Sequence, residues 1–238
     1  MKRLELTLPT LAENLALDEA LLEESESTGD DSGWLRLWEY GQQAVVLGRS
    51  SIAAIEVEVE DCRTAGIELG RRCSGGATVL IGPGCLMYSL VLPHATTGGL
   101  DVDRMHCQVL GTMQRGLQRL QPGVSCAGTS DLAIGGRKFS GNSLRVKRSH
   151  FLYHGTVLYD LSPRDVARFL RHAPRQPAYR AGRDHASFVD NFPARREELA
   201  QAIVDAWNAH DVSSDWPRSR TAQLVADRYA HHAWTFAR

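Results

Sequence analysis

The sequence predicts an α+β fold with mixed or antiparallel β-sheets flanked by helices. Short apolar runs bounded by Gly, Pro, Asn and Ser, which are typical of strands, recur through the middle of the chain. Longer stretches with apolar residues at helical spacing occupy both ends and the centre. At 238 residues and 43% hydrophobic composition, the chain can bury one large core. We expect a single domain over residues 1–238.

The first predicted helix covers residues 11–24. Thr10 and Glu13 have the Thr-x-x-Glu form of a capping box, and leucines follow at roughly helical spacing. Residues 25–33 are rich in Ser, Asp and Gly, which favours a solvated loop. The other predicted helices are residues 57–64, residues 101–120, a helix that begins at Ser162, and residues 193–210 and 219–232.

The predicted strands lie mainly between residues 34 and 159. The stretch 77–92 is expected to form two strands separated at Gly82-Pro83-Gly84, since proline cannot donate a hydrogen bond within a central strand. The Gly135-Gly136 pair predicts a tight hairpin between two further strands. Residues 174–192 are expected to be irregular. The remaining predicted strands are residues 34–38, 44–47, 67–69 and 151–159.

The composition argues against several functional classes. A net charge of -1 gives no global attraction to nucleic acid or acidic membranes, and no uncharged stretch is long enough to cross a bilayer. We expect no helix-turn-helix before Thr10 and therefore no nucleic-acid binding. The cysteines are odd in number and lack CxxC spacing, which favours reduced thiols and a cytoplasmic location; they are Cys62, Cys73, Cys85, Cys107 and Cys126.

Residues 70–80 combine two cations with a turn of small residues. Gly75 and Gly76 can adopt positive φ and let a ligand approach the backbone closely. Their N–H groups can then form a nest for an anion. Arg71 and Arg72 add permanent charges suited to phosphate or carboxylate. The residues alone are equally compatible with a glycine-rich hairpin that carries exposed arginines.

The hairpin of residues 130–143 places Lys138 just after its Gly-Gly turn. Lysine is rare in this chain, because only Lys2, Lys138 and Lys147 occur among the 27 basic residues. The lysine between Arg137 and a Ser-Gly step therefore indicates that this position requires a compact ammonium group rather than a guanidinium group.

Three motifs resemble the lipoate-protein ligase A family, which belongs to the superfamily of biotin/lipoate ligases and octanoyltransferases. They are Arg-Arg-x-Ser-Gly-Gly at residues 71–76, Gly-Arg-Lys-x-Ser-Gly at 136–141 and His-Gly-Thr at 154–156. Residues 14–22 and 229–234 extend the resemblance to nearly the whole chain. The resemblance implies a biotin/lipoate ligase-like catalytic domain without the small carboxy-terminal domain of many ligases.

The family resemblance implies an enzyme that attaches lipoate or octanoate to a lysine of a lipoyl acceptor domain. The reaction would consume ATP with Mg²⁺ and pass through an acyl-adenylate. The acceptor would be a 2-oxoacid dehydrogenase subunit or a glycine-cleavage H-type protein. A separate small accessory ligase subunit could take part.

The same resemblance implies a set of site residues. Lys138 would be catalytic and bind the acyl carboxylate and the α-phosphate, and Asp131 would hold Mg²⁺ or the adenine part. The residues implied to bind ATP or the acyl-adenylate are Arg72, Ser74, Gly75, Gly76, Ala77, Thr78, Val79, Leu80, Asp131 and Lys138. Those implied to bind the acyl group are Arg49, Gly75, Gly76, Ser140, Gly141, His154 and Gly155.

Two alternatives stay open. An ATP-independent octanoyltransferase would take octanoyl from acyl carrier protein through a cysteine thioester, and Cys126 is the candidate nucleophile. In another branch that cysteine would stand where this chain has Phe151, which argues against that branch. A non-catalytic acyl-binding protein is favoured by two departures from the family pattern, Ala77 in place of a third glycine and Ile81-Gly82 in place of His-Asp.

Overall fold

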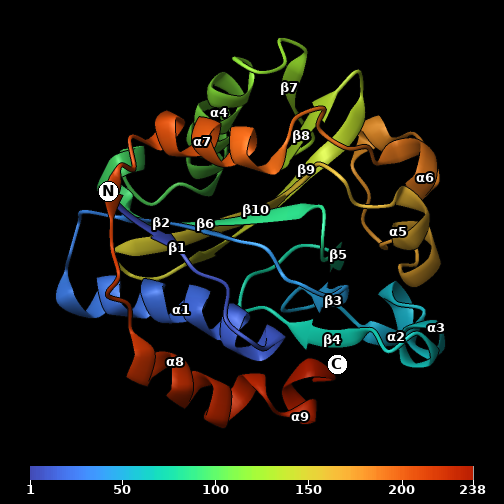
Figure 1. The fold of residues 1–238 in the computed structure, drawn as a ribbon, viewed down its shortest axis with the longest axis horizontal. Helices are drawn as coiled ribbons and strands as arrows, with labels where there is room; N and C mark the ends of the chain where they lie inside the picture. The colour runs from blue at the N-terminus through green and yellow to red at the C-terminus, as the bar shows by residue number, and fades with distance from the viewer. Residues whose placement is uncertain (238) are drawn as a thin grey trace.

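The computed structural model describes residues 1–237 and has two β-sheets flanked by helices, which confirms the predicted fold class (Figure 1). Most strand pairs of the larger sheet are antiparallel, and β1 lies parallel to β2 and β11. The strands of the larger sheet, in spatial order, are β11 (Asp211–Val212), β1 (Lys2–Glu5), β2 (Trp34–Trp38), β6 (Cys85–Pro93), β10 (His150–Leu158), β9 (Arg137–Val146), β8 (Asp131–Ile134) and β7 (Val124–Ala127). The smaller sheet has the order β4 (Glu68–Arg71), β3 (Ala44–Leu47) and β5 (Val79–Ile81).

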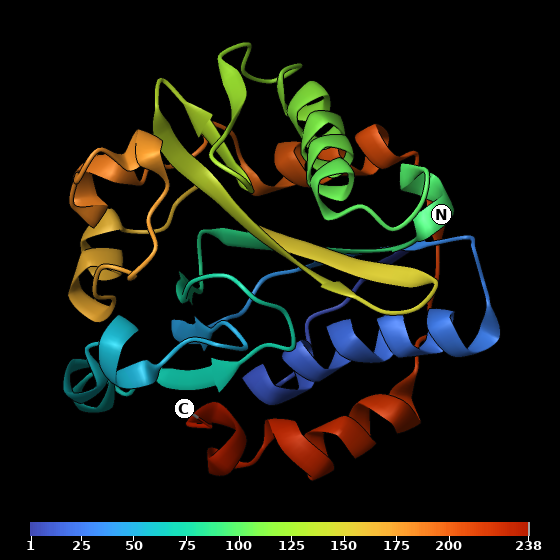
Figure 2. The same cartoon turned by 180° about the vertical axis from the view of Figure 1, so that it is seen from behind.

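Helices cover both faces of the larger sheet (Figures 1 and 2). The helices α4 (Val102–Leu117) and α7 (Arg196–Trp207) pack on one face, and α1 (Leu11–Thr28) and the smaller sheet lie on the other. The remaining helices are α2 (Ala53–Glu56), α3 (Val59–Thr64), α5 (Pro163–Phe169), α6 (His185–Phe188), α8 (Arg218–Leu224) and α9 (His232–Thr235), with short turns η1 (His94–Thr97), η2 (Ala178–Arg180) and η3 (Val225–Tyr229). Among residues 1–237, none of these helices has both the length and the apolar character needed to cross a bilayer.

Strand β10 shows how the sheet separates the core from the site. Successive side chains of a strand point to opposite faces, and Phe151, Tyr153 and Val157 join the core formed with α4 and α7. His154 and Thr156 lie between them in sequence, and they line the cavity on the opposite face. The predicted apolar stripe of α4 is buried in the core from Met105 to Leu117, including both methionines, whereas Val102 at the start of the helix is 47% exposed.

Helix α1 begins as predicted but ends one turn later. The side chain of Thr10 accepts from the backbone N–H of Glu13, and the Glu13 carboxylate accepts from Thr10 N–H, so the capping box is present. The loop predicted from residue 25 is wrong in its first part, because α1 continues to Thr28 and ends at Gly29 with φ 69°. The hydroxyl group of Thr28 donates to the carbonyl of Glu24, which lets a polar turn continue the helix.

Three other segments differ from the prediction. Strand β1 was not expected, because only Leu4 of its four side chains is buried and no alternation marks it. The helix predicted over residues 57–64 is α3 and begins two residues later than predicted, since Val57 adopts extended backbone with φ -129° and ψ 141° and separates it from α2, which was not predicted. The helix predicted over residues 219–232 is interrupted by the π-helical turn η3 and then by Ala230. The Tyr229 hydroxyl at the end of η3 donates to the buried carboxylate of Glu19.

Candidate functional site

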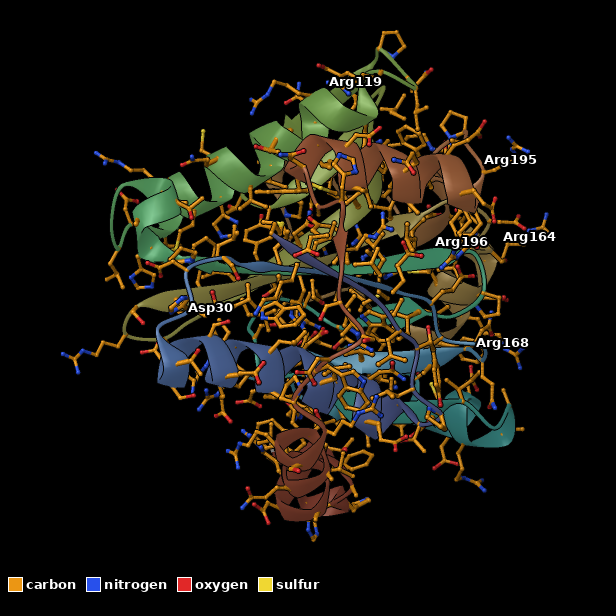
Figure 3. The ribbon with its side chains drawn as sticks, turned by 60° about the vertical axis from the view of Figure 1, so that its left-hand side comes forward. Asp30, Arg119, Arg164, Arg168, Arg195 and Arg196 are labelled. Carbon is orange, nitrogen blue, oxygen red and sulfur yellow. The ribbon has the colours of Figure 1, made fainter. Side chains whose placement is uncertain are left out.

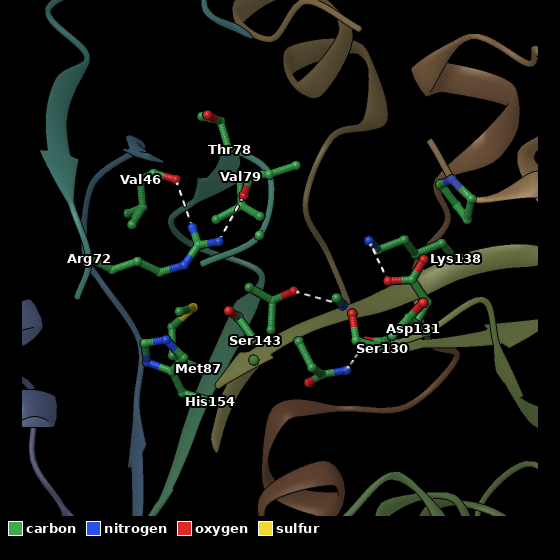
Figure 4. A pocket seen from close by; sticks show the side chains of 18 of the residues that line it. Val46, Arg72, Thr78, Val79, Met87, Ser130, Asp131, Lys138, Ser143 and His154 are labelled. Atoms are coloured by element: carbon green, nitrogen blue, oxygen red, sulfur yellow. Dashed lines mark hydrogen bonds and ion pairs between the residues drawn. The ribbon is translucent and has the colours of Figure 1, made fainter. Parts of the chain in front are cut away.

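A cleft of about 540 Å³ lies on the face of the larger sheet that α1 and the smaller sheet cover. Its walls come from segments far apart in the sequence, as the close-up shows (Figure 4). Leu15 from α1, Trp38 from β2, Val46 from β3 and Met87 from β6 give it an apolar part. Lys138 from β9 lines another part of the same cleft.

A smaller cavity of about 130 Å³ adjoins the cleft. The two share several lining residues, among them Thr78 and Lys138, so they meet at that place. Most other side chains of the smaller cavity are apolar, for example Phe139 and Leu158. Such adjoining spaces suit an elongated ligand whose middle lies beside Lys138.

The ammonium group of Lys138 pairs with Asp131 at 2.7 Å (Figure 4). The second carboxylate oxygen of Asp131 accepts from the Tyr179 hydroxyl at 2.8 Å. Burial and the neighbouring carboxylate both raise the pKa of Tyr179, so this phenol stays a donor. Lys138 is 28% exposed and Asp131 only 9% at the side chain, so the ammonium group is the member of the pair that a ligand can reach.

The geometry gives weak support to Asp131 as a magnesium ligand. Each of its oxygens already accepts from a protein donor, Lys138 or Tyr179. Within residues 1–237 no group of three or more His, Cys, Asp and Glu side chains is arranged to hold a metal ion. Asp131 acts in this arrangement as the partner that orients Lys138.

The predicted anion nest at the glycine turn forms differently from expectation. Gly76 adopts φ 81°, whereas Gly75 lies outside the positive-φ region. The carboxylate of Glu56 lies against the turn, where it accepts from the backbone N–H of Thr78 at 2.9 Å and from its hydroxyl at 2.8 Å. The turn does hold an anion, and that anion is a side chain of the protein.

The two arginines of the turn have different roles from those predicted. Arg72 lines the cleft, but its guanidinium group donates to Ser74 Oγ and to the carbonyls of Val46, Gly75 and Ala77. Burial lowers the pKa of Arg72 to about 10, which still leaves it charged at neutral pH. Its hydrogen bonds hold the turn in shape, so little of this cation is left for a phosphate.

Arg71 lies outside the cleft lining and is almost fully buried. Its guanidinium group donates to carbonyls that include those of Gly48 and Ser51 on one side and Thr235 on the other. Charge-assisted hydrogen bonds of this kind are among the stronger ones. The phosphate-binding prediction for Arg71 is therefore wrong, and Arg71 joins the small sheet to the last helix.

A buried hydrogen-bonded chain lies beside the cleft. His154 Nδ1 is 3.1 Å from Asp18 Oδ2, and His154 Nε2 is 2.5 Å from Ser74 Oγ. Burial alone would raise the pKa of Asp18, but the ion pair with Arg36 and the hydrogen bond to His154 outweigh it, so that pKa is lowered. Arg36 pairs with Asp18 at 2.7 Å with both side chains buried. Sequence reasoning missed Asp18 and Arg36, although Asp18 lies within the opening motif of residues 14–22.

The structure brings together most of the residues expected to bind nucleotide or acyl group. Ala77, Thr78, Val79 and Gly141 line both cavities. Gly76, His154 and Gly155 line the cleft alone, and Leu80 and Ser140 line the smaller cavity alone. Ser74 and Gly75 lie behind this lining and contact it through hydrogen bonds to His154 and Arg72.

Two candidate residues lie away from both cavities. Arg49 is exposed and lines neither of them, since its backbone rather than its side chain contacts the turn through the Ser74 carbonyl. Cys126 pairs in register with Leu132, whose side chain belongs to the core on the α4 face. Its thiol lies 3.1 Å from Gln114 of α4, and desolvation raises its pKa. Cys126 therefore lies on the wrong face of the sheet to act in the cleft.

Known proteins resemble this chain over most of its length. The family model described as lipoyl protein ligase A/B catalytic domain matches residues 10–213. A protein of Aeropyrum pernix named "Putative lipoate-protein ligase A" is 29% identical over 82% of this chain and 70% of its own. The octanoyltransferase LipM of Carboxydothermus hydrogenoformans is 24% identical over 94% of both chains. A relative from Mycoplasma pneumoniae, 28% identical, is covered over 45% of its length.

Solved structures agree on the fold. A lipoate-protein ligase A bound with ATP has a TM-score of 0.83 at 20% identity, over 99% of both chains. The bi-partite lipoate protein ligase of Thermoplasma acidophilum has a TM-score of 0.82 at 20% identity, over 99% of this chain and 95% of that one. The family match over residues 10–213, which is most of the chain, shows that the chain belongs to the family of lipoyl protein ligase A/B catalytic domains.

Proposed function

We propose that this protein is an ATP-dependent ligase that attaches lipoate or octanoate to a lysine of an acceptor protein. The observation that carries the proposal is the position of Lys138, which lines both the cleft and the smaller cavity. The acyl chain would lie in the cleft against Leu15, Trp38, Val46 and Met87. The adenosine part of ATP would lie in the smaller, largely apolar cavity. The reacting groups would then meet at Lys138.

The chemistry follows from a fixed cation at that meeting point. An oxygen of the acyl carboxylate attacks the α-phosphorus of ATP, pyrophosphate leaves, and an acyl-adenylate forms. The acceptor amine then attacks the acyl carbonyl carbon, and AMP leaves with the bonding electrons. Lys138 would stabilise the negative charge that develops in both steps, because a pre-oriented ammonium group needs no reorganisation. Asp131 would keep that ammonium group in place.

The proposal includes Mg²⁺, which would be bound to the phosphates of ATP. Magnesium in nucleotide sites is usually held by one or two carboxylates together with substrate phosphates. Asp131 is the carboxylate paired with Lys138 and would serve as such a partner while it keeps its contact with the ammonium group. The ion would neutralise phosphate charge during adenylate formation.

The acceptor would be a lipoyl domain of a 2-oxoacid dehydrogenase subunit or a glycine-cleavage H-type protein. Two names among the similar proteins support this. The structural analysis of the Thermoplasma acidophilum lipoylation system names the ligase and its E2 lipoyl domain, and a Kyrpidia tusciae relative is named octanoyl-[GcvH]:protein N-octanoyltransferase. A separate small accessory subunit is part of the proposal, since the Thermoplasma acidophilum ligase is bi-partite.

Intact-mass spectrometry of a lipoyl acceptor domain tests the proposed function. The domain is incubated with this protein and either lipoate plus Mg-ATP or octanoyl-acyl carrier protein without ATP. We expect a lipoyl mass gain in the first mixture and none in the second. A gain only from the carrier protein would replace the ligase by a transferase. No gain in either mixture, with and without an accessory subunit, would contradict the proposal.

Cys126→Ser is expected to leave ATP-dependent acylation unchanged. Neither cavity has a cysteine in its lining among residues 1–237, and a thioester route needs a thiol at the carbonyl. The buried thiol of Cys73 is equally unsuited, because burial raises its pKa to about 12. Initial rates of both proteins are compared in the mass assay. A rate loss of about 100-fold or more, of the size expected for a nucleophile, would favour the transferase route.

Arg180→Gln is expected to raise the KM for ATP about ten-fold and to leave the KM for lipoate unchanged. Arg180 lines the smaller cavity and is 5% exposed, and its Nη2 has no hydrogen-bond partner among residues 1–237. A buried cation without a full set of hydrogen-bond partners is stabilised when a ligand supplies an acceptor. A ten-fold change in the KM for ATP corresponds to about 1.4 kcal/mol. Arg164→Gln is the matched control, because Arg164 is exposed on α5 and points away from the molecule (Figure 3). If the two variants had equal KM values for ATP, Arg180 would not be part of the nucleotide site.

A further inference from the structure

The opening motif of residues 14–22 gives the proposed acyl site the apolar contact of Leu15, and it also supplies one end of the buried chain beside the cleft. Asp18 on α1 contacts both Arg36 on β2 and His154 on β10. His154 in turn contacts Ser74, whose hydroxyl oxygen accepts from Arg72 Nε at 3.1 Å. Five side chains from four separate segments are thus connected in one line, and Asp18, Arg72 and His154 also line the cleft.

The hydrogens in this line can be assigned from the chemistry of its members. Arg36 only donates, and it is already held by the carbonyls of Leu6 and Asn14 and by the Asn14 side chain. Its remaining donor meets Asp18 Oδ1 at 2.7 Å. An ionised carboxylate only accepts, so the hydrogen between Asp18 Oδ2 and the ring must be on His154 Nδ1.

The other end of the line fixes the second ring nitrogen. Arg72 Nε only donates, so Ser74 Oγ accepts from it and has its own hydrogen left to give. In the neutral imidazole, with the hydrogen on Nδ1, Nε2 is an acceptor. Ser74 Oγ–H therefore donates to His154 Nε2. Every polar atom in the line then has a partner, and the ring offers no free donor or acceptor to the cleft.

We propose that Asp18 and Arg36 are positioning residues that hold His154 in the Nδ1–H tautomer and, through Ser74, fix Arg72 and the glycine turn that it supports. The consequence for the cleft is that a histidine and an aspartate can line it without presenting unpaired polar atoms. An apolar acyl chain can then pack beside them without the cost of leaving a buried polar group unsatisfied. This consequence, though not the tautomer, rests on the function proposed above.

Asp18→Asn separates this role from a merely structural one. An amide cannot accept at both ends, so one side must become a donor. Facing Arg36, that donor would leave one N–H of the buried guanidinium group without an acceptor, which is costly. The amide is therefore expected to face His154 and to donate to Nδ1, and the ring must move its hydrogen to Nε2. Ser74 Oγ would then receive two donors, and its own hydrogen would lose its acceptor.

The tautomer is measured by ¹⁵N spectroscopy of histidine-labelled protein at alkaline pH. The His154 signals are assigned by their disappearance in His154→Gln. We expect Nδ1–H in the unmodified protein and Nε2–H in Asp18→Asn. An Nε2–H ring or a doubly protonated ring in the unmodified protein overturns the proposal, and this measurement needs no catalytic activity.

Kinetics supply the second measurement. We expect Asp18→Asn to raise the KM for lipoate about ten-fold, the equivalent of one lost hydrogen bond, while the KM for ATP stays unchanged. Glu19→Gln is the matched control, since Glu19 is a buried carboxylate next along α1 that contacts Tyr229 and Arg228 instead of His154. The His154 ring in the Glu19→Gln protein should stay in the Nδ1–H tautomer. An unchanged tautomer in Asp18→Asn, or the same switch in Glu19→Gln, also overturns the proposal.

Discussion

Lys138→Ala is expected to abolish acyl transfer and to leave the fold intact. The ammonium group lines both cavities, as Arg175 also does, and it is the cation placed beside the reacting groups in the proposed mechanism. Loss of a comparable electrostatic contact typically costs about 100-fold to 1,000-fold in rate, and Lys138 would act in both chemical steps, so we expect at least the larger loss. The side chain is partly exposed, and Asp131 keeps its hydrogen bond from Tyr179. The measurements are acyl transfer by intact mass and thermal unfolding.

Lys147→Ala is the control for removing a lysine from the larger sheet region. Lys147 follows β9, pairs with Glu23 at 3.0 Å, and lines neither cavity. Its loss should change neither the rate nor, by more than about 1 kcal/mol, the free energy of unfolding. A Lys138→Ala protein that transfers acyl groups at more than a tenth of the normal rate would remove Lys138 from the chemistry.

Gly48→Ala is expected to destabilise the protein by about 3 kcal/mol or more and to suppress acyl transfer in whatever remains folded. A Cβ at residue 48 would lie 1.9 Å from the carbonyl oxygen of Gly76 and 3.2 Å from that of Gly75. Both atoms are backbone, so relief requires the glycine turn itself to move away. Overpacking usually costs about 1–3 kcal/mol, and a contact this short belongs at or above the upper end. Thermal or urea unfolding measures the loss.

Gly41→Ala serves as the matched glycine control. Gly41 lies before β3 as Gly48 lies after it, and a Cβ there would meet nothing within 4 Å. The change should be neutral or slightly stabilising, because alanine narrows the unfolded ensemble. If the Gly48→Ala and Gly41→Ala proteins had the same thermal or urea unfolding midpoint, the backbones of residues 48 and 76 would not be in the close contact described here.

Local patterns were enough to predict the framework of the site. The Gly-Gly pair fixes a hairpin, and the hairpin fixes Lys138 just beyond it, so turn chemistry alone placed the central residue on β9. The break at Gly82-Pro83-Gly84 and the capping box at Thr10 were predictable for the same reason. Such features depend on a few adjacent residues and are visible in a single sequence.

The roles of individual charges were not predictable in the same way. Arg71 and Arg72 are adjacent in sequence and look alike as anion ligands, yet alternation along β4 sends one toward the last helix and the other toward the cleft. Cys126 lies away from the cleft because its register with Leu132 puts it on the core face. Arg36 contacts Asp18 across 18 positions of sequence. Each outcome depends on which face of a sheet a side chain takes, and that depends on distant partners.

The contact between Glu56 and the glycine turn has a consequence for selectivity in a crowded solution. The backbone N–H of Thr78 is already occupied by a carboxylate of the protein. A lone phosphate or sulfate ion must displace that internal competitor with nothing else to hold it, and it gains little. A nucleotide that also fills an adjoining cavity makes further contacts, and these can offset the cost of displacing the Glu56 carboxylate from Thr78. We therefore expect inorganic phosphate or sulfate to compete poorly with Glu56 for the turn, and a nucleotide anchored in the adjoining cavity to displace Glu56 more readily.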